Sequence, residues 1–109
     1  MLSVLVEFSM FPTSSDGREG GASVSKSVSK IIDAIDKSGV PYQLTPMGTV
    51  IEAPSMREAL DVIALAYEQV SDCERVYSSL KFDIRHNTEN RLKTKIDSVE
   101  KVLGRAVSH

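Results

Sequence analysis

Apolar and polar residues alternate between residues 3 and 10, the period of a strand with one buried face. The apolar positions are Val4, Val6, Phe8 and Met10. Glu7 and Ser9 fall on the opposite face, and we expect Phe11 and Pro12 to end the strand. Residues 76–85 show the same alternation, with Leu80, Phe82 and Ile84 opposite Lys81 and Asp83. Two strands of the same kind are therefore predicted near the two ends of the chain.

Three other segments carry apolar residues at helical spacing. The first covers about residues 23–38 and stops at Gly39, and the second starts at Ser55, where Glu58 completes a capping box. The third covers about residues 89–103, with a cap expected at residues 87–88 and a stop at Gly104. The stripes expected to be buried are Val24, Val28, Ile31, Ile32 and Ile35; Met56, Leu60, Ile63, Tyr67 and Val70; and Leu92, Ile96, Val99 and Leu103.

A β-hairpin is predicted between the first two helices. Residues 40–44 and 49–52 are both β-prone, and they meet at a turn expected at Met47-Gly48. Pro46 removes a backbone donor and suits a strand end, and Gly48 tolerates positive φ and leaves the backbone open to a neighbour. Residues 13–21 are rich in serine and glycine, which favours a loop that serves as a lid.

The predicted order is strand, helix, strand, strand, helix, strand and an additional C-terminal helix. The first six elements match a ferredoxin-like α+β sandwich with a four-stranded antiparallel sheet and both helices on one face. In this topology the first and third strands are central and the last pairs with the first. We expect residues 1–109 to form one domain, and the uncovered face of its sheet to pack against a partner subunit.

Composition narrows the possible functions. The formal net charge of -2 gives no overall attraction to nucleic acid or anionic lipid. Cys73 is the one cysteine, which excludes an internal disulfide and a cysteine-rich zinc site. No histidine, cysteine or carboxylate spacing indicates a metal site or a catalytic triad. The apolar run at residues 4–6 is too short for a signal peptide or membrane span, so we expect a cytoplasmic protein.

Three short motifs follow one another along the chain: Ser38-Gly39-x-x-Tyr42, Pro46-Met47-Gly48-Thr49-x-x-Glu52 and Lys81-x-Asp83-x-Arg85. Together they resemble the thiamine-binding-protein family, over about residues 6–102, with Ala53 where that family usually has glycine. The resemblance implies non-enzymatic binding of thiamine or of its hydroxymethylpyrimidine part, for carriage, buffering or sensing. It also implies a homo-oligomer, a dimer or tetramer packed through sheet faces and edges.

The candidate ligand-binding residues form two groups. Glu7, Ser9, Lys81 and Asp83 share the uncovered face of the two paired strands, where a carboxylate is the strongest acceptor for a pyrimidine amino group. The other interpretation of these four is a salt-bridged polar surface. Met47 and Phe11 are expected to sandwich a flat ring, while Gly48 and Thr49 offer hydrogen bonds; ordinary core packing is the alternative for Phe11.

The sequence also allows other interpretations of these residues and of the function. Arg85 would neutralise a phosphate, pair with an acid of another subunit, or remain a solvated charge. Subunit packing alone, without a ligand, would account for much of the pattern. An RNA-binding module lacks the aromatic residues it would need at residues 49–52. An enzyme would use Glu7, Lys81 and Asp83 for proton transfer in a buried cleft. We expect no catalytic residue, no metal and no cofactor other than the thiamine-type ligand.

Overall fold

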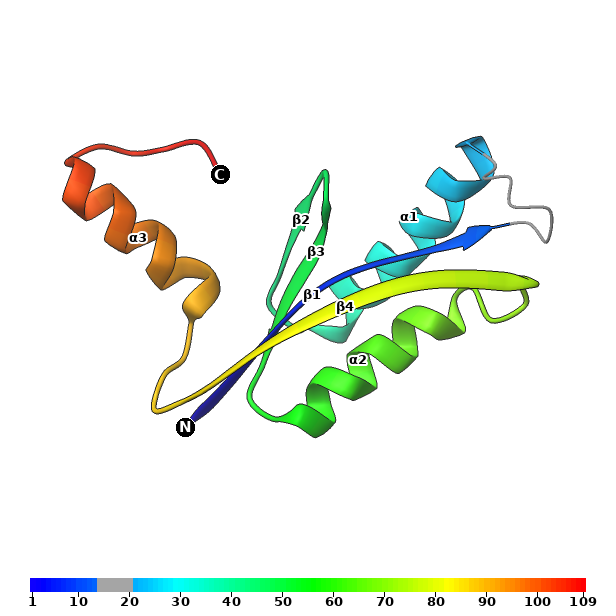
Figure 1. Cartoon of the computed structure of the whole chain (residues 1–109), viewed down its shortest axis with the longest axis horizontal. Helices are drawn as coiled ribbons and strands as arrows, with labels where there is room; N and C mark the ends of the chain where they lie inside the picture. Colours follow the sequence, from blue (N-terminus) through cyan, green and yellow to red (C-terminus); the bar gives the residue numbers. More distant parts are fainter. Residues whose placement is uncertain (14–20) are drawn as a thin grey trace.

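The computed structural model describes residues 1–13 and 21–109, in which four strands and three helices follow the predicted order (Figure 1). The strands are β1 (Leu2–Thr13), β2 (Tyr42–Thr45), β3 (Gly48–Ala53) and β4 (Arg75–His86). The helices are α1 (Gly21–Ser38), α2 (Met56–Glu68) and α3 (Arg91–Leu103). Apart from its two end residues, the loop expected to act as a lid lies outside the described residues.

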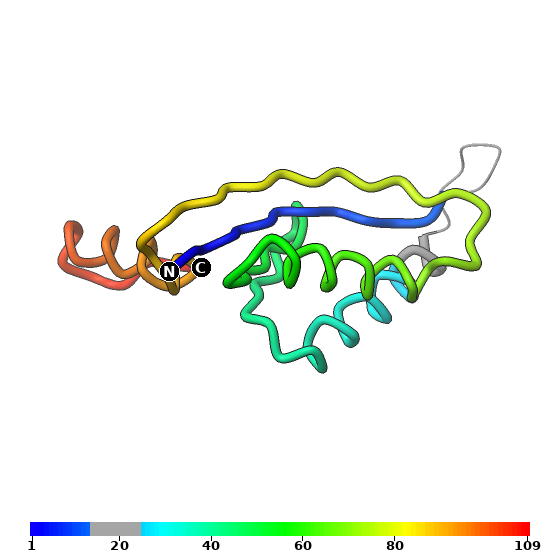
Figure 2. The backbone as a smooth tube through the Cα atoms, turned by 90° about the horizontal axis from the view of Figure 1, so that it is seen from below, coloured from blue at the N-terminus to red at the C-terminus, as the bar shows by residue number. Residues whose placement is uncertain are grey.

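The strands form one antiparallel sheet in the order β2-β3-β1-β4. As predicted, β1 and β3 are central and β4 pairs with β1 along its whole length. Figure 2 shows β1 and β4 above α1 and α2, so that both helices lie on the same side of the sheet. We call the other side the open face. This arrangement confirms the ferredoxin-like α+β fold, to which α3 is added.

The core lies between the sheet and the two helices. Alternation places Val4 and Val6 of β1 against Ile35 of α1, and all three side chains are fully buried. Ile51 of β3 joins them opposite Val6 in the sheet. The predicted apolar faces of β1 and α1 are therefore correct for the residues whose burial is described.

The capping box at the start of α2 is confirmed, but the buried stripe of that helix is not the expected one. The Ser55 hydroxyl accepts the Glu58 N–H at 3.1 Å and donates to the Glu58 carboxylate at 2.9 Å. The core-facing residues are Ala59, Val62 and Ala66. Leu60 and Tyr67, expected to be buried, are about half exposed. Small alanines let the helix lie close to the sheet, which moves the larger residues to its flanks.

Strand β1 is longer than predicted, because Pro12 does not end it. β1 remains paired with β4 as far as Thr13, whereas its pairing with β3 stops at Phe8. Beyond Phe8, one side of β1 is therefore a sheet edge. Proline is tolerated on such an edge because its missing N–H has no ladder partner to lose.

Helix α3 lies beyond the end of the sheet, away from α1 and α2 (Figure 1). It starts at Arg91 rather than Glu89, and neither Asn87 nor Thr88 caps it; Asn90 holds the cap position with φ 56° and no side-chain cap bond. Gly104, with φ 72°, ends the helix as predicted. No residue of α3 is buried within the described chain, so its predicted apolar stripe is only partly covered.

Candidate functional site

A pocket of about 350 Å³ lies beside the β2–β3 hairpin, between the hairpin, the outer half of β1 and α1. Its apolar walls include Phe8 and Met10 of β1, Leu44 of β2, and Ile31 and Ile32 of α1. Five of the eight sequence-predicted ligand residues line it: Ser9, Phe11, Met47, Gly48 and Thr49. A volume of this size suits a small aromatic ligand.

The turn that forms one rim of the pocket lies one residue earlier than predicted. Pro46 and Met47 make the turn, and Gly48 already pairs with Thr45 as the first residue of β3. The Thr45 hydroxyl closes the turn by donating to the Gly48 carbonyl at 2.8 Å and accepting the Met47 N–H at 3.2 Å. The Met47 side chain is left 87% exposed at the rim, where a ligand would meet it first.

Gly48 is required by a close approach between strands. Its φ is +155°, and a Cβ built on it would lie 2.8 Å from the backbone oxygen of Phe8. Any larger residue would push the hairpin away from β1 at the point where the pocket begins. The glycine of the motif therefore sets the width of the pocket on the β1 side.

The end of the β1–β3 ladder exposes the backbone of β1 to the pocket. Pairing with β3 stops at Phe8 and Thr49, while Ser9, Met10 and Phe11 continue along the pocket wall. Backbone groups on that edge of β1 are directed where β3 would otherwise bind them. These backbone groups and the buried Thr49 hydroxyl are the hydrogen-bonding groups that a ligand between the apolar walls would meet.

Glu7 and Lys81 lie directly opposite each other on the open face, as the predicted parity requires. Ser9 faces Ser79 two residues further along, and Phe11 faces Tyr77, with ring centroids 5.8 Å apart. Glu7 and Lys81 are both exposed and neither lines the hairpin pocket. Glu7 shares the open face with Ser9, so its carboxylate lies on the opposite side of β1 from the apolar walls that Phe8 and Met10 give the pocket.

Asp83 is separated from the other predicted ligand residues. It pairs with Leu5 in the sheet, and its carboxylate forms an ion pair with Arg91 of α3 at 3.0 Å. Its role in this structure is to hold α3 against β4. As a ligand residue it stays a prediction, and the geometry assigns it to a different part of the molecule from the hairpin pocket.

Sequence reasoning missed the role of Glu52 of β3, the buried charged residue among those that the structure describes. Its carboxylate accepts the Ser3 hydroxyl at 2.5 Å and the N–H groups of Arg91 and Leu92 at 3.0 and 3.2 Å. The last two bonds cap the first turn of α3, a favourable place for a negative charge. In the sequence, Glu52 stands out only as the last residue of the Pro46-to-Glu52 motif. Its partners lie 39 to 49 residues away in sequence, so no local pattern indicates them.

Arg91 completes this polar cluster. Its Nε donates to the Ser3 hydroxyl at 2.9 Å, and its Nη2 donates to the backbone oxygens of Ser3 and Asp83 at 2.8 and 2.6 Å. The guanidinium thereby connects β1, β4 and α3 while Glu52 connects β1, β3 and α3. The cluster of Ser3, Glu52, Asp83 and Arg91 fixes where α3 leaves the sheet.

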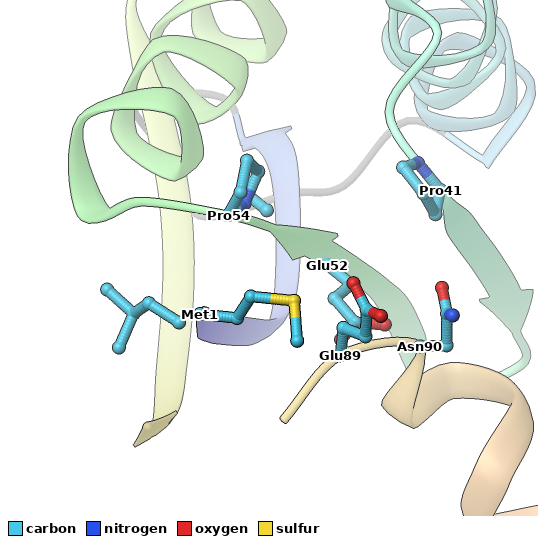
Figure 3. Close-up of a pocket in the computed structure, with 8 residues that line it drawn as sticks. Met1, Pro41, Glu52, Pro54, Glu89 and Asn90 are labelled. Carbon is cyan, nitrogen blue, oxygen red and sulfur yellow. The ribbon is translucent and has the colours of Figure 1, made fainter. Parts of the chain in front are cut away.

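A second pocket, of about 310 Å³, lies next to this cluster (Figure 3). In Figure 3 the side chains of Glu52, Glu89 and Asn90 gather on one side, with Met1 and two prolines around the opening. Because Glu52 already accepts three hydrogen bonds, it has little capacity left for a ligand. This pocket is therefore lined by carboxylates near α3 and by neither of the residues predicted to stack on a ring.

The cluster shifts the pKa of Glu52. Burial by itself would raise the pKa of the Glu52 carboxyl, but the hydrogen bonds from Ser3, Arg91 and Leu92 and the charge of Arg91 together lower it below its usual 4.5. Among the described residues, no three histidine, cysteine or carboxylate side chains are grouped to hold a metal ion. Over the same residues, no helix is long and apolar enough to cross a membrane.

Comparison with known proteins places the chain in a family. The sequence pattern of the family described as thiamine-binding protein matches residues 6–100. A UPF0045 protein of Methanocaldococcus jannaschii is 36% identical over 100 residues, covering 91% of this chain and 94% of the relative. One from Methanothermobacter thermautotrophicus is 33% identical over 83 residues, covering 74% and 84%. The chain therefore belongs to the thiamine-binding protein family.

Solved structures agree with the fold. A crystal structure of a hypothetical protein from M. jannaschii has a TM-score of 0.72 at 33% identity and covers 93% of this chain and 99% of its own. A crystal structure from Thermotoga maritima, whose name proposes a role in thiamine biosynthesis or salvage, has a TM-score of 0.68. At 21% identity, with 89% and 98% coverage, it supports the fold alone.

The lowered pKa of Glu52 predicts a pH-dependent contribution to stability. Because the folded pKa lies below the unfolded one, this contribution is present above about pH 4.5 and is lost as pH falls further. We expect Glu52→Gln to lower the free energy of unfolding at pH 7 by about 1–3 kcal/mol, since it removes the charge from a buried acceptor. Urea unfolding at pH 7 and pH 3.5 measures both effects.

The difference in the free energy of unfolding between wild type and Glu52→Gln should be smaller at pH 3.5 than at pH 7. Glu68→Gln on the exposed end of α2 is the matched control, and it should change stability by less than about 0.5 kcal/mol at either pH. An equal loss in Glu52→Gln at both pH values would show that the carboxylate charge does not stabilise α3.

Proposed function

We propose that this protein binds thiamine, or its hydroxymethylpyrimidine part, in the pocket beside the β2–β3 hairpin, without catalysing a reaction on it. One observation carries the proposal. The family motif at residues 46–49 and the outer part of β1 meet at a single pocket. Five of the ligand residues predicted from the sequence line this pocket. The family is described by binding, and the name of the T. maritima neighbour points to the same vitamin.

The chemistry of the pocket suits a flat, polar ring. Phe8, Met10 and the isoleucines of α1 offer apolar surface to the ring faces, and the Met47 thioether adds a polarisable contact at the rim. The Thr49 hydroxyl and the open backbone edge of β1 serve ring nitrogens and an amino group. Glu7 lies outside the pocket on the open face, opposite Lys81, so the proposed binding mode gives it no direct contact with the ring. Carriage, buffering or sensing of the vitamin are the roles that such binding allows.

We test this site by calorimetric titration with thiamine and with hydroxymethylpyrimidine. We expect saturable micromolar binding by the wild type. Thr49→Val removes one buried hydroxyl and should weaken binding about tenfold, the value of one hydrogen bond. Met47→Ala should weaken it several-fold without affecting the fold, because the Met47 side chain is 87% exposed.

Thr94→Val on α3 is the matched control, because it makes the same substitution far from the hairpin. It should leave thiamine binding unchanged, because Thr94 does not line the hairpin pocket. Absence of binding by a folded wild type would reject the proposed function. Binding that Met47→Ala and Thr49→Val both leave intact would reject this site while keeping the function.

We propose in addition that the protein acts as a homo-oligomer in which a second copy covers β4. Strand β4 is a long edge strand, and Leu80, Phe82 and Ile84 on its core-side face are 38–48% exposed because the helices do not reach them. Val99 and Leu103 of α3 are also about half exposed. Long apolar edges of this kind are normally covered in soluble proteins.

The oligomer is tested by light scattering after size-exclusion chromatography. We expect a mass of two or four times the 11.9 kDa chain for the wild type. Phe82→Lys places a charge in the proposed contact and should shift the mass toward the single chain. Leu44→Lys, at the opposite edge of the sheet, should keep the oligomer. A wild-type protein that elutes as a single chain would contradict the proposal.

A further inference from the structure

A third cavity, of about 430 Å³, lies between the open face of the sheet and α3. One wall is formed by the end of β4 with Asp83 and Arg85, and the other by the side of α3 that carries Arg91 and Lys95. Leu5 of β1 also lines it. This cavity uses none of the residues that line the hairpin pocket.

The cavity is positively charged in a protein whose formal net charge is -2. Three cationic side chains, Arg85, Arg91 and Lys95, face one carboxylate, that of Asp83. Asp83 is already neutralised by Arg91 at 3.0 Å, and the Arg91 side chain is only 11% exposed. The charge that remains for a ligand therefore comes from Arg85 and Lys95, which are both exposed.

Hydroxyl groups surround these two cations. Thr94 and Ser98 lie one turn apart on the same side of α3, and Thr88 lies on the segment that leads into the helix. No hydrogen bond between described residues occupies any of the three hydroxyls. The N–H groups at the start of α3 are not part of the site, because Glu52 already accepts those of Arg91 and Leu92.

We propose that this cavity binds the phosphoryl group of a small phosphorylated compound, or free phosphate. A phosphate monoester carries close to two negative charges and three acceptor oxygens. Arg85 and Lys95 match the charge, and the three hydroxyls match the acceptors. A carboxylate would leave most of these donors without a partner. The small volume and the negative net charge argue against a nucleic-acid strand.

The side chains of Arg91 and Asp83 position this site rather than bind the ligand. Their ion pair fixes the angle between β4 and α3, so that Arg85 on the strand and Lys95 on the helix face the same space. The site is independent of the proposed vitamin pocket, since the two cavities share no residue. Loss of one is therefore distinguishable from loss of the other.

The test is titration of the full chain with inorganic phosphate, pyrophosphate and glycerol 3-phosphate at low ionic strength, followed by calorimetry and by amide NMR shifts. We expect saturable binding that weakens with added sodium chloride and shifts the amides of residues 94–98. Lys95→Gln and Arg85→Gln should each weaken binding about tenfold, which corresponds to one charge-assisted hydrogen bond. Tighter binding of the ester than of phosphate would identify a phosphorylated metabolite, and the reverse would identify free phosphate.

Lys93→Gln is the matched control, because it removes the same charge from α3 but lies beside Leu92 and Ile96 in a different groove. It should change phosphate affinity less than twofold, as should Met47→Ala at the hairpin. Absence of saturable binding by any of the three anions would overturn the proposal. An equal loss of phosphate affinity in Lys93→Gln and Lys95→Gln would also overturn it, because it would show a general attraction of anions to α3.

Discussion

The buried carboxylate of Glu52 is the interaction on which the outer part of this structure depends. It lies next to the last residue of β3, accepts the Ser3 hydroxyl of β1 and accepts the first two N–H groups of α3. Arg91, held next to it, extends the connection to Asp83 of β4. Three strands and α3 therefore meet at one charged cluster rather than at an apolar contact, which explains how α3 is held in place although none of its residues is buried.

The same short motif serves two ends of β3. Gly48 at its start allows the hairpin to approach the Phe8 backbone and shapes the hairpin pocket. Glu52 near its end positions α3 and, through Arg91, the basic cavity on the open face. A strand of six residues thus sets the geometry of both proposed binding sites. This gives a physical reason for finding a glycine and a glutamate four residues apart in one motif.

Much of the fold could be predicted from the sequence, because its signals are local. Alternation marked β1 and β4, and Ser55 with Glu58 marked the start of α2. The errors arose where distant parts of the chain decide. The persistence of β1 past Pro12 depends on where β3 stops, and the buried side of α2 depends on how closely alanines let it approach the sheet. The cap of α3 comes from Glu52, 39 residues earlier, so residues 87–88 gave a misleading local signal.

The residues of the candidate site could be predicted from the sequence, but not that they lie in separate parts of the molecule. Strand parity placed Glu7 opposite Lys81, and the motif brought Met47, Gly48 and Thr49 next to Ser9 and Phe11. Nothing in the sequence showed that Asp83 would pair with Arg91 instead. The direct test of the hairpin pocket is amide NMR of the labelled protein titrated with thiamine. We expect the shifts to concentrate at residues 8–11 and 44–49; shifts confined to β4 and α3, with none at the hairpin, would contradict the assignment of the vitamin site.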